Sequence, residues 1–333
     1  VSPAPQEPRP PPAKRPRPAD PPKRTIGCIL GSDSYGTNSD IWDVLALAGF
    51  IPKKPTCKYC ARPVKFDKEK EKLHFSLFCS KCRKRTNVFR KTDLFQVKNI
   101  REFFGALEGW CNGDLVVNIR ARLGLSRDAW RSYKQIFESA VSNVIVRAGE
   151  TPEGQLGGVG IVVEVDECHV HSRKFNRGNP LASEKLWVVG VMERTQNADG
   201  GRKAAFFVTV KRDAGTLLPF IRKWVAPGSI LISDEWKGYT RELEEAYFPA
   251  KVNHSVRYAQ WGVVDGVEMS INTNHIEREW REVRKVLAYV PASEYQAKLN
   301  KEVFRLLYLA GCPREERAFV FLKTMAELAK QDP

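Results

Sequence analysis

The feature that most constrains the fold is an alternating apolar segment at residues 160–167, which ends on two neighbouring carboxylates. Its Val and Ile residues recur with the period of a β-strand, so we predict a strand here. The strand brings Asp166 to its end, where the backbone leaves the sheet and the side chain faces solvent or a metal ion. The partners of Asp166 are therefore the central question about this chain.

The sequence after this strand has the pattern of an α/β layer. Three strands in series are followed by alternating helix and strand, which predicts a sheet with helices on both faces. The expected strands lie at 160–167, 186–194, 204–211, 229–233 and 251–254, and the expected helices at 215–225, about 239–246 and 273 to about 289.

Composition divides the rest of the chain. Residues 1–38 are rich in proline and basic residues and predict a disordered tail, because they offer little apolar surface to bury. The remaining segments are a short helix plus cysteine pairs at 39–96, a helical region at 97–148, a glycine-rich linker at 149–159, the α/β core at 160–290 and a C-terminal helical segment at 291–333.

Positive charge is concentrated in one part of the chain. The net charge is +15, and residues 51–100 hold 15 Lys and Arg against 4 Asp and Glu. Such a concentration is typical of a protein that binds a polyanion, since each neutralised phosphate releases a counterion. The alternative is a solvated basic face without a partner.

Two Cys-x-x-Cys pairs lie inside this basic window. Cys57 and Cys60 are separated by eighteen residues from Cys79 and Cys82, a spacing that allows four thiolates to surround one structural zinc ion. His74 lies between the pairs and is an alternative ligand, but four cysteines form the simpler set. Three cations follow the last cysteine and are expected to contact a DNA backbone: Arg83, Lys84 and Arg85.

The helical region has the proportions of a helix-turn-helix. Helices are expected at 97–110, 113–123 and 127–147, and the last two are joined by Gly124-Leu125-Ser126. The helix that begins at Arg127 would enter the major groove, and Arg127, Arg131 and Lys134 would contact phosphates or bases. A generic helical bundle produces the same pattern.

No run of eighteen apolar residues occurs, so we expect a soluble protein without a membrane partner. The basic clusters of the tail indicate nuclear import if the chain is eukaryotic, and a cytoplasmic or nucleoid location otherwise.

Three further side chains are candidates to work with Asp166. Asp234 ends the fourth strand, and the helix that follows residue 273 places Asn274 and Glu277 one turn apart on a polar face. If the first and fourth strands are neighbours, the aspartates meet at one end of the sheet. Carboxylates brought together in this way repel one another unless divalent cations lie between them, an arrangement that supports two-metal phosphodiester cleavage.

Several motifs in this order resemble the Merlin superfamily of DDE transposases and the related bacterial insertion-sequence transposases. They are Val165-Asp166-Glu167, Lys174-Phe175-Asn176-Arg177-Gly178, Gly190-Val191-Met192-Glu193-Arg194, the segment from Gly228 to Tyr239, Val252-Asn253-His254-Ser255, and the segment from Thr273 to Trp280. The resemblance covers about residues 50–290. It implies an RNase H-like catalytic core behind a zinc ribbon and cut-and-paste movement of DNA.

The resemblance also implies roles for individual residues. Asp166, Asp234 and Glu277 would hold two Mg²⁺ or Mn²⁺ ions, with Asn274 as a helper or as the alternative third ligand. Arg284 or Lys285 would hold a DNA phosphate.

From the residues alone, Arg173, Lys174 and Arg177 just past Asp166 are expected to hold a phosphate backbone, with a solvated loop as the alternative. Glu167 and His275 are expected to be structural, and the alternative for His275 is to orient a metal ligand or contact DNA.

The partners implied are double-stranded DNA, as terminal inverted repeats and as target, and a second copy of the chain in a homodimer. Two other interpretations remain: a domesticated DNA-binding protein without catalysis, and a metal-dependent nuclease on the same fold.

Overall fold

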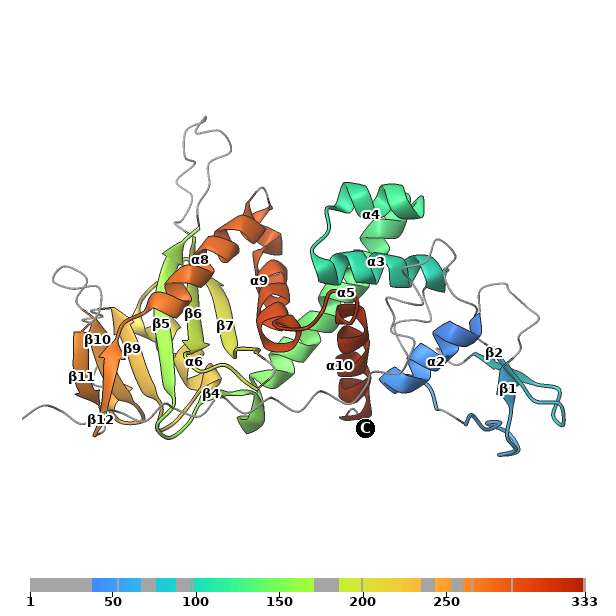
Figure 1. Cartoon of the computed structure of the whole chain (residues 1–333), viewed down its shortest axis with the longest axis horizontal. Helices are drawn as coiled ribbons and strands as arrows, with labels where there is room; N and C mark the ends of the chain where they lie inside the picture. The colour runs from blue at the N-terminus through green and yellow to red at the C-terminus, as the bar shows by residue number, and fades with distance from the viewer. Residues whose placement is uncertain are drawn as a thin grey trace, which may run out of the picture.

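A computed structural model describes residues 38–52, 54–66, 76–87, 97, 99–170, 186–198, 200–234, 243–252, 260–264, 266–288 and 290–331. Its centre is a five-stranded sheet in the order β10-β9-β5-β6-β7 (Figure 1). The strands are β5 (Val162–His169), β6 (Trp187–Glu193), β7 (Ala204–Thr209), β9 (Ile230–Asp234) and β10 (Phe248–Val252). The first three form an antiparallel meander, and β9 and β10 run parallel to β5.

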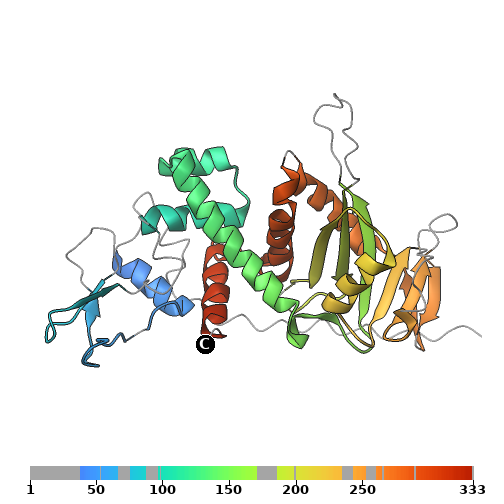
Figure 2. The ribbon, with the colours of Figure 1, turned by 180° about the vertical axis from the view of Figure 1, so that it is seen from behind.

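Helices cover both faces of this sheet, as the sequence pattern predicted. Helix α8 (Asn274–Leu287) crosses one face and α6 (Ala214–Trp224) the other (Figures 1 and 2). Four residues of α8 at helical spacing are buried: Ile276, Trp280, Val283 and Leu287. Gly190 of β6 permits this close approach, because a Cβ atom there would lie 2.7 Å from the Trp280 ring.

The helical region consists of α3 (Ile100–Asn112), α4 (Val116–Leu123) and α5 (Arg127–Ala148). The predicted turn between the last two is confirmed. Gly124 ends α4 with a φ of 64°, a conformation that glycine adopts without strain, and the Ser126 side chain caps α5 by accepting from the Ala129 N–H at 3.1 Å.

The C-terminal helices connect the helical region to the sheet. Helix α9 (Tyr295–Phe304) packs on α5 and β7, and α10 (Arg317–Gln331) packs on α2 and α3. Between them, residues Arg305–Leu309 form a π-helical turn. The Leu306 carbonyl in this turn accepts a hydrogen bond from the Arg202 backbone N–H at 2.9 Å, which ties the turn to the segment before β7.

The N-terminal part holds α2 (Asn38–Ala48) and a small antiparallel sheet of β1 (Lys65–Phe66), β2 (Ser76–Phe78) and β3 (Arg85–Asn87). Buried Ile41, Leu45 and Ala48 form the inner face of α2. The predicted short helix is therefore confirmed, and the cysteine pairs lie in the loops of the small sheet.

Two parts of the fold differ from the sequence prediction. The hairpin β11 (Gln260–Val264) and β12 (Val267–Ile271) was not predicted, although Asp265-Gly266 between alternating residues is a hairpin signal. The predicted linker 149–159 contains a 3₁₀ turn (Pro152–Gly154) and the strand β4 (Leu156–Gly157), which pairs with β8 (Val225–Ala226), because buried Leu156 anchors it.

The first half of the predicted helix at 239–246 lies outside the described residues, and in the second half only residues 243 and 244 are helical before a turn. Within the part of the chain that is described, no helix has the length and apolar character needed to cross a membrane.

Candidate active site and zinc centre

Asp166 lies inside β5 and not at its end as predicted, because the strand continues through buried Cys168 to His169. Its neighbours Val163 and Val165 are fully buried, whereas Asp166 is half-buried on the face that α8 covers. The Trp280 indole Nε1–H donates to Asp166 Oδ2 at 2.6 Å. This charge-assisted hydrogen bond fixes the rotation of the carboxylate and attaches α8 to the strand.

Asp234 lies on the neighbouring strand. Strands β5 and β9 are parallel, and their register pairs Val165 with Ser233. Asp166 and Asp234 are each the next residue along, so the two strands are adjacent, as the prediction required, and the two aspartates are neighbours at the point where β9 ends. The Asp234 side chain is outside the described residues.

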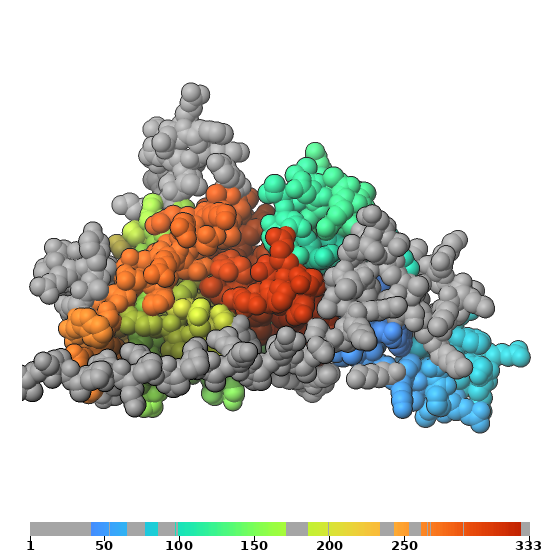
Figure 3. Space-filling view, in the orientation of Figure 1, coloured from blue at the N-terminus to red at the C-terminus, as the bar shows by residue number. Residues whose placement is uncertain are grey.

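Helix α8 brings the third candidate to this face. Glu277 is exposed, and its Oε1 accepts from the Thr273 hydroxyl at 2.6 Å. Asn274 is exposed as well, and its backbone N–H donates to Asn272 Oδ1 at 3.2 Å. Since Trp280 is one turn after Glu277 and bonds Asp166, the helix is held with this segment beside Asp166. In the space-filling view, α8 lies at the surface across the sheet (Figure 3).

Sequence reasoning missed two charged residues beneath this helix, Glu164 and Arg194. Glu164 is fully buried and accepts hydrogen bonds from the backbone N–H groups of His275 and Ile276 at 2.9 and 3.0 Å. Arg194 Nε–H donates to Glu164 Oε1 at 3.0 Å. The available signal was an acidic residue at an inward position of an otherwise apolar strand, which requires a partner.

Glu167 and His275, which were predicted to be structural, each contact a charged neighbour. Glu167 Oε2 accepts from Arg212 Nη1 at 2.9 Å, and the Arg212 guanidinium lies 3.8 Å from the centre of the Trp187 ring. His275 Nδ1 lies 2.8 Å from Glu164 Oε1.

Arg284 and Lys285 are exposed in the last turns of α8. Burial raises the pKa of the Cys168 thiol, and the nearby Arg284 guanidinium opposes that shift. Arg284 therefore lies near the strand that carries Asp166. Lys285 instead forms an exposed ion pair with Glu282 at 3.3 Å.

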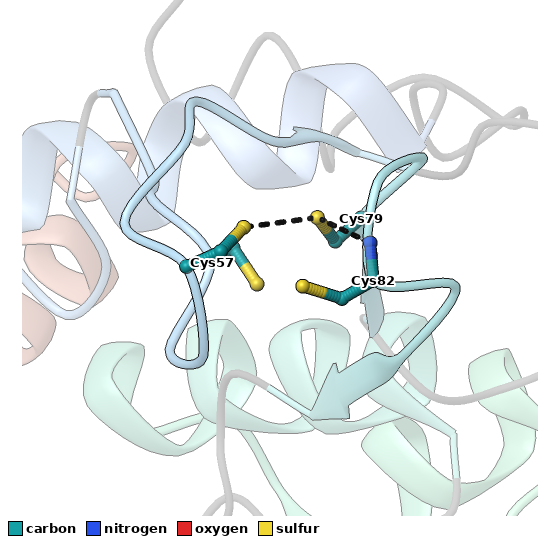
Figure 4. Close-up of side chains that lie close together, drawn as sticks. Cys57, Cys79 and Cys82 are labelled. Atoms are coloured by element: carbon teal, nitrogen blue, oxygen red, sulfur yellow. Dashed lines mark hydrogen bonds between the residues drawn. The ribbon is translucent and has the colours of Figure 1, made fainter.

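The four predicted zinc ligands come together. The sulfur atoms of four cysteines all lie within 4.8 Å of one another: Cys57, Cys60, Cys79 and Cys82. Figure 4 shows Cys57, Cys79 and Cys82 directed toward one another. No other group of at least three His, Cys, Asp or Glu residues meets this criterion among the described positions, which exclude His74 and the Asp234 side chain.

The two cysteine pairs have the same backbone geometry. Cys57 N–H donates to Arg62 O at 2.7 Å and Cys79 N–H to Lys84 O at 3.1 Å. The residue that follows the second cysteine of each pair has a positive φ, which is 53° for Ala61 and 54° for Arg83.

Backbone groups also polarise the sulfur atoms. The Cys82 N–H donates to Cys79 Sγ at 3.5 Å and is the main cause that lowers the pKa of the Cys79 thiol to about 7. The hydrogen bond with Cys60, together with burial, raises the pKa of Cys82. Four converging sulfur atoms with N–H···S bonds fit a tetrahedral zinc ion, whose charge would stabilise all four as thiolates.

The predicted DNA-contacting cations occupy different environments. Arg83, Lys84 and Arg85 are exposed, and the Lys84 ammonium lies 4.1 Å from the centre of the exposed Tyr59 ring. Arg127 and Arg131 are exposed on α5, and Arg131 pairs with Asp128.

Lys134 differs from these, because its Nζ pairs with Glu294 at 2.7 Å. Arg173, Lys174 and Arg177 are outside the described residues.

Residues 155–291 match the family model described as the ISXO2-like transposase domain. The match supports a DDE transposase family. The matched segment contains all five strands of the central sheet and α8, with Asp166, Asp234 and Glu277. No curated protein and no solved structure matches the chain. A transposase domain implies binding to DNA, cleavage or transfer of its strands, and a requirement for divalent metal ions.

Proposed function

We propose that this chain is a cut-and-paste DNA transposase of the Merlin type. It would bind terminal inverted repeats, cleave the ends of the transposon by metal-dependent hydrolysis and join them to target DNA. The observation that carries the proposal is the parallel pairing of β5 with β9, which makes Asp166 and Asp234 neighbours within the matched transposase domain.

The sheet topology supports an RNase H-like core. An antiparallel three-stranded meander is extended by two parallel strands, and helices lie on both faces. We propose that Asp166, Asp234 and Glu277 hold the divalent ions, with Asn274 beside them. The bound ions would activate the attacking hydroxyl and stabilise the leaving oxygen. The chain itself would orient Asp166 through Trp280 and hold the DNA phosphate through Arg284.

The N-terminal modules would select the DNA. The four cysteines hold one structural zinc ion in this proposal, and Arg83, Lys84 and Arg85 lie against the phosphate backbone. Arg127 and Arg131 at the start of α5 would reach the major groove. A homodimer would bring two transposon ends together for coordinated cleavage.

One experiment tests this function against the two alternatives, a metal-dependent nuclease and a DNA-binding protein without catalysis. The full chain is incubated with Mg²⁺ or Mn²⁺ and a DNA duplex that carries the terminal repeats flanking its own coding sequence, with a scrambled duplex as control. We expect metal-dependent cleavage of the repeats that Asp234→Ala abolishes. Equal cleavage of both duplexes would identify a nuclease, and binding without any cleavage would identify a DNA-binding protein that lacks catalysis.

A further inference from the structure

We propose that Glu164 is a positioning residue that fixes α8, and with it Glu277, against the strand that carries Asp166. The inference rests on the proposed function, because it assigns Glu277 to the metal site. Glu164 is fully buried on β5, two residues before Asp166, so both side chains lie on the face that α8 covers.

Glu164 completes the hydrogen bonding at the N-terminus of α8. The first N–H groups of a helix have no partner within it. Here the Asn274 N–H donates to Asn272 Oδ1, and the His275 and Ile276 N–H groups both donate to Glu164 Oε2. Thr273, the N-cap residue, does not cap through its side chain. A carboxylate from a strand therefore acts as the helix cap, where the helix dipole favours negative charge.

The remaining oxygen of Glu164 is also occupied. Its Oε1 lies 3.0 Å from Arg194 Nε and 2.8 Å from His275 Nδ1. A carboxylate offers about four acceptor positions, and these four contacts use them all. Glu164 therefore has no position left for a metal ion, and it acts on the site only through the helix.

Arg194 extends this attachment to the segment that leads into the helix. Its Nη1 donates to Ser270 O at 2.7 Å and its Nη2 to Asn272 O at 2.6 Å. One guanidinium thus joins the buried carboxylate of β5 to the two carbonyls that precede α8. The ion pair compensates the charge of Glu164 within the core.

These contacts and the Trp280–Asp166 bond hold α8 at two points about one and a quarter turns apart. Two attachments fix both the translation and the rotation of the helix on β5. Glu277 lies between them, so its position relative to Asp166 is fixed as well. Displacing a reacting group by about 1 Å can lower a rate by roughly 100-fold, so the attachment has a catalytic consequence.

The test compares Glu164→Gln with Glu193→Gln in the zinc-loaded full chain. Gln retains one carbonyl oxygen but places an NH₂ group where Arg194 or the helix N–H groups need an acceptor. Glu193 is a matched control: it is also buried and accepts a backbone N–H, from Gly157 at 2.7 Å, but its side chain lies on the opposite face of the sheet.

Three measurements are made. Hydrogen exchange of the segment 273–280 is expected to be at least about 10-fold faster in Glu164→Gln. Mn²⁺ binding, measured by the loss of the free-ion electron paramagnetic resonance signal, is expected to weaken by about 10-fold. In DNA cleavage, kcat should fall by about 10-fold or more while KM for DNA stays within about twofold, and Glu193→Gln should resemble wild type in all three.

Asp166→Ala separates this inference from the proposed function. If Asp166→Ala leaves Mn²⁺ binding unchanged, the proposed metal site is wrong, while the exchange measurement still tests whether Glu164 anchors the helix. If Asp166→Ala weakens Mn²⁺ binding but Glu164→Gln leaves binding, kcat and exchange as in wild type, the positioning role is overturned. If Glu164→Gln does not fold, Arg194→Lys replaces it, because lysine keeps the positive charge but cannot make the forked contacts of the guanidinium. The same three measurements then decide whether the positioning role holds.

Discussion

At the scale of single residues, the candidate site combines a strongly held aspartate with an exposed helix turn. Asp166 is oriented by an indole N–H, and Glu277 is held by the Thr273 hydroxyl. These hydrogen bonds order the carboxylates before any ion binds, which reduces the entropy lost on binding. The helix turn offers two candidates for the third ligand, and they differ in chemistry: a carboxylate binds a hard cation more strongly than an amide does.

Glu277→Gln and Asn274→Ala distinguish these candidates. We expect Glu277→Gln to lower the kcat of metal-dependent DNA cleavage by about 100-fold or more and Asn274→Ala by less than about 10-fold. Both side chains are exposed, so the free energy of unfolding should change by no more than about 0.5 kcal/mol in either variant. The measurement is single-turnover cleavage with thermal unfolding alongside. A larger loss in Asn274→Ala would make the amide the essential ligand.

At the scale of elements, the contact between α8 and α9 contains a buried acidic pair. Glu279 of α8 and Glu302 of α9 both form ion pairs with Arg305. The Arg305 Nη2 atom lies 3.0 Å from Glu279 Oε1. Burial, and then the neighbouring Glu302, raises the pKa of Glu279 to about 7. We therefore expect the packing of the helix that carries Glu277 to depend on pH.

Stability should fall as the pH rises through this pKa. The folded-state pKa of Glu279 lies above the usual glutamate value of 4.5, so its contribution to stability is complete below about pH 4.5 and is lost as the pH rises through about 7. Glu279→Gln keeps the group neutral and should remove about 1–2 kcal/mol of the loss in unfolding free energy between pH 5 and pH 8. Urea unfolding at both pH values measures this.

Glu282→Gln is the control for Glu279, because Glu282 lies on the outer side of α8 in an exposed pair with Lys285. Its pH dependence should match that of wild type. An unchanged pH dependence in Glu279→Gln would contradict the assignment.

Two basic residues of helix α5 are expected to have different roles: Arg127 contacts DNA and Lys134 stabilises the fold. Arg127 is exposed at the first turn, whereas Lys134 pairs with Glu294 and lies 3.7 Å from Glu138. We expect Arg127→Ala to lower the slope of log affinity for DNA against log salt by about one, with unfolding unchanged. Lys134→Ala should instead lower the free energy of unfolding by about 1 kcal/mol and leave the salt slope unchanged. A fluorescence-anisotropy salt titration tests both, and the opposite pattern would assign the DNA contact to Lys134.

At the scale of the whole molecule, the cysteine cluster and the central sheet are expected to depend on different forces. The apolar side chains of the sheet pack into two buried clusters, whereas the described part of residues 54–87 buries few apolar side chains, among them Val64 and Leu77. Binding of zinc by the four cysteines would therefore supply much of the folding free energy of residues 54–66 and 76–87.

Removal of zinc should unfold that region alone. We expect one zinc ion per chain, and Cys79→Ser or a chelator should release it. Hydrogen exchange should then accelerate in residues 54–66 and 76–87 but not in β5 or α8. Metal content and exchange measured by mass spectrometry provide the test, with Cys312→Ser, a cysteine outside the cluster, as the control. Loss of protection throughout the sheet would show that the two parts fold as one unit.

The sequence by itself predicted most of the helices and strands and the cluster of four cysteines. Local signals were sufficient there: the alternating residues of β5, Gly124 and Ser126 at the turn before α5, and the spacing of the cysteine pairs. Each depends on neighbours within a few residues or on a short closed loop, so it can be predicted from the sequence. The same reasoning placed Asp234 correctly at the end of its strand, but it ended the strand of Asp166 two residues too early and could not establish that the two strands were neighbours.

Only the tertiary structure decided that pairing and what lies beneath α8. The partners of Glu164 come from β6 and from the start of α8, 30 and 111 residues away. No local pattern encodes contacts over such separations, because they form only when the sheet and the helix pack together. Burial made the carboxylate of Glu164 require partners, and the fold supplied them at the helix N-terminus that holds Glu277 in place.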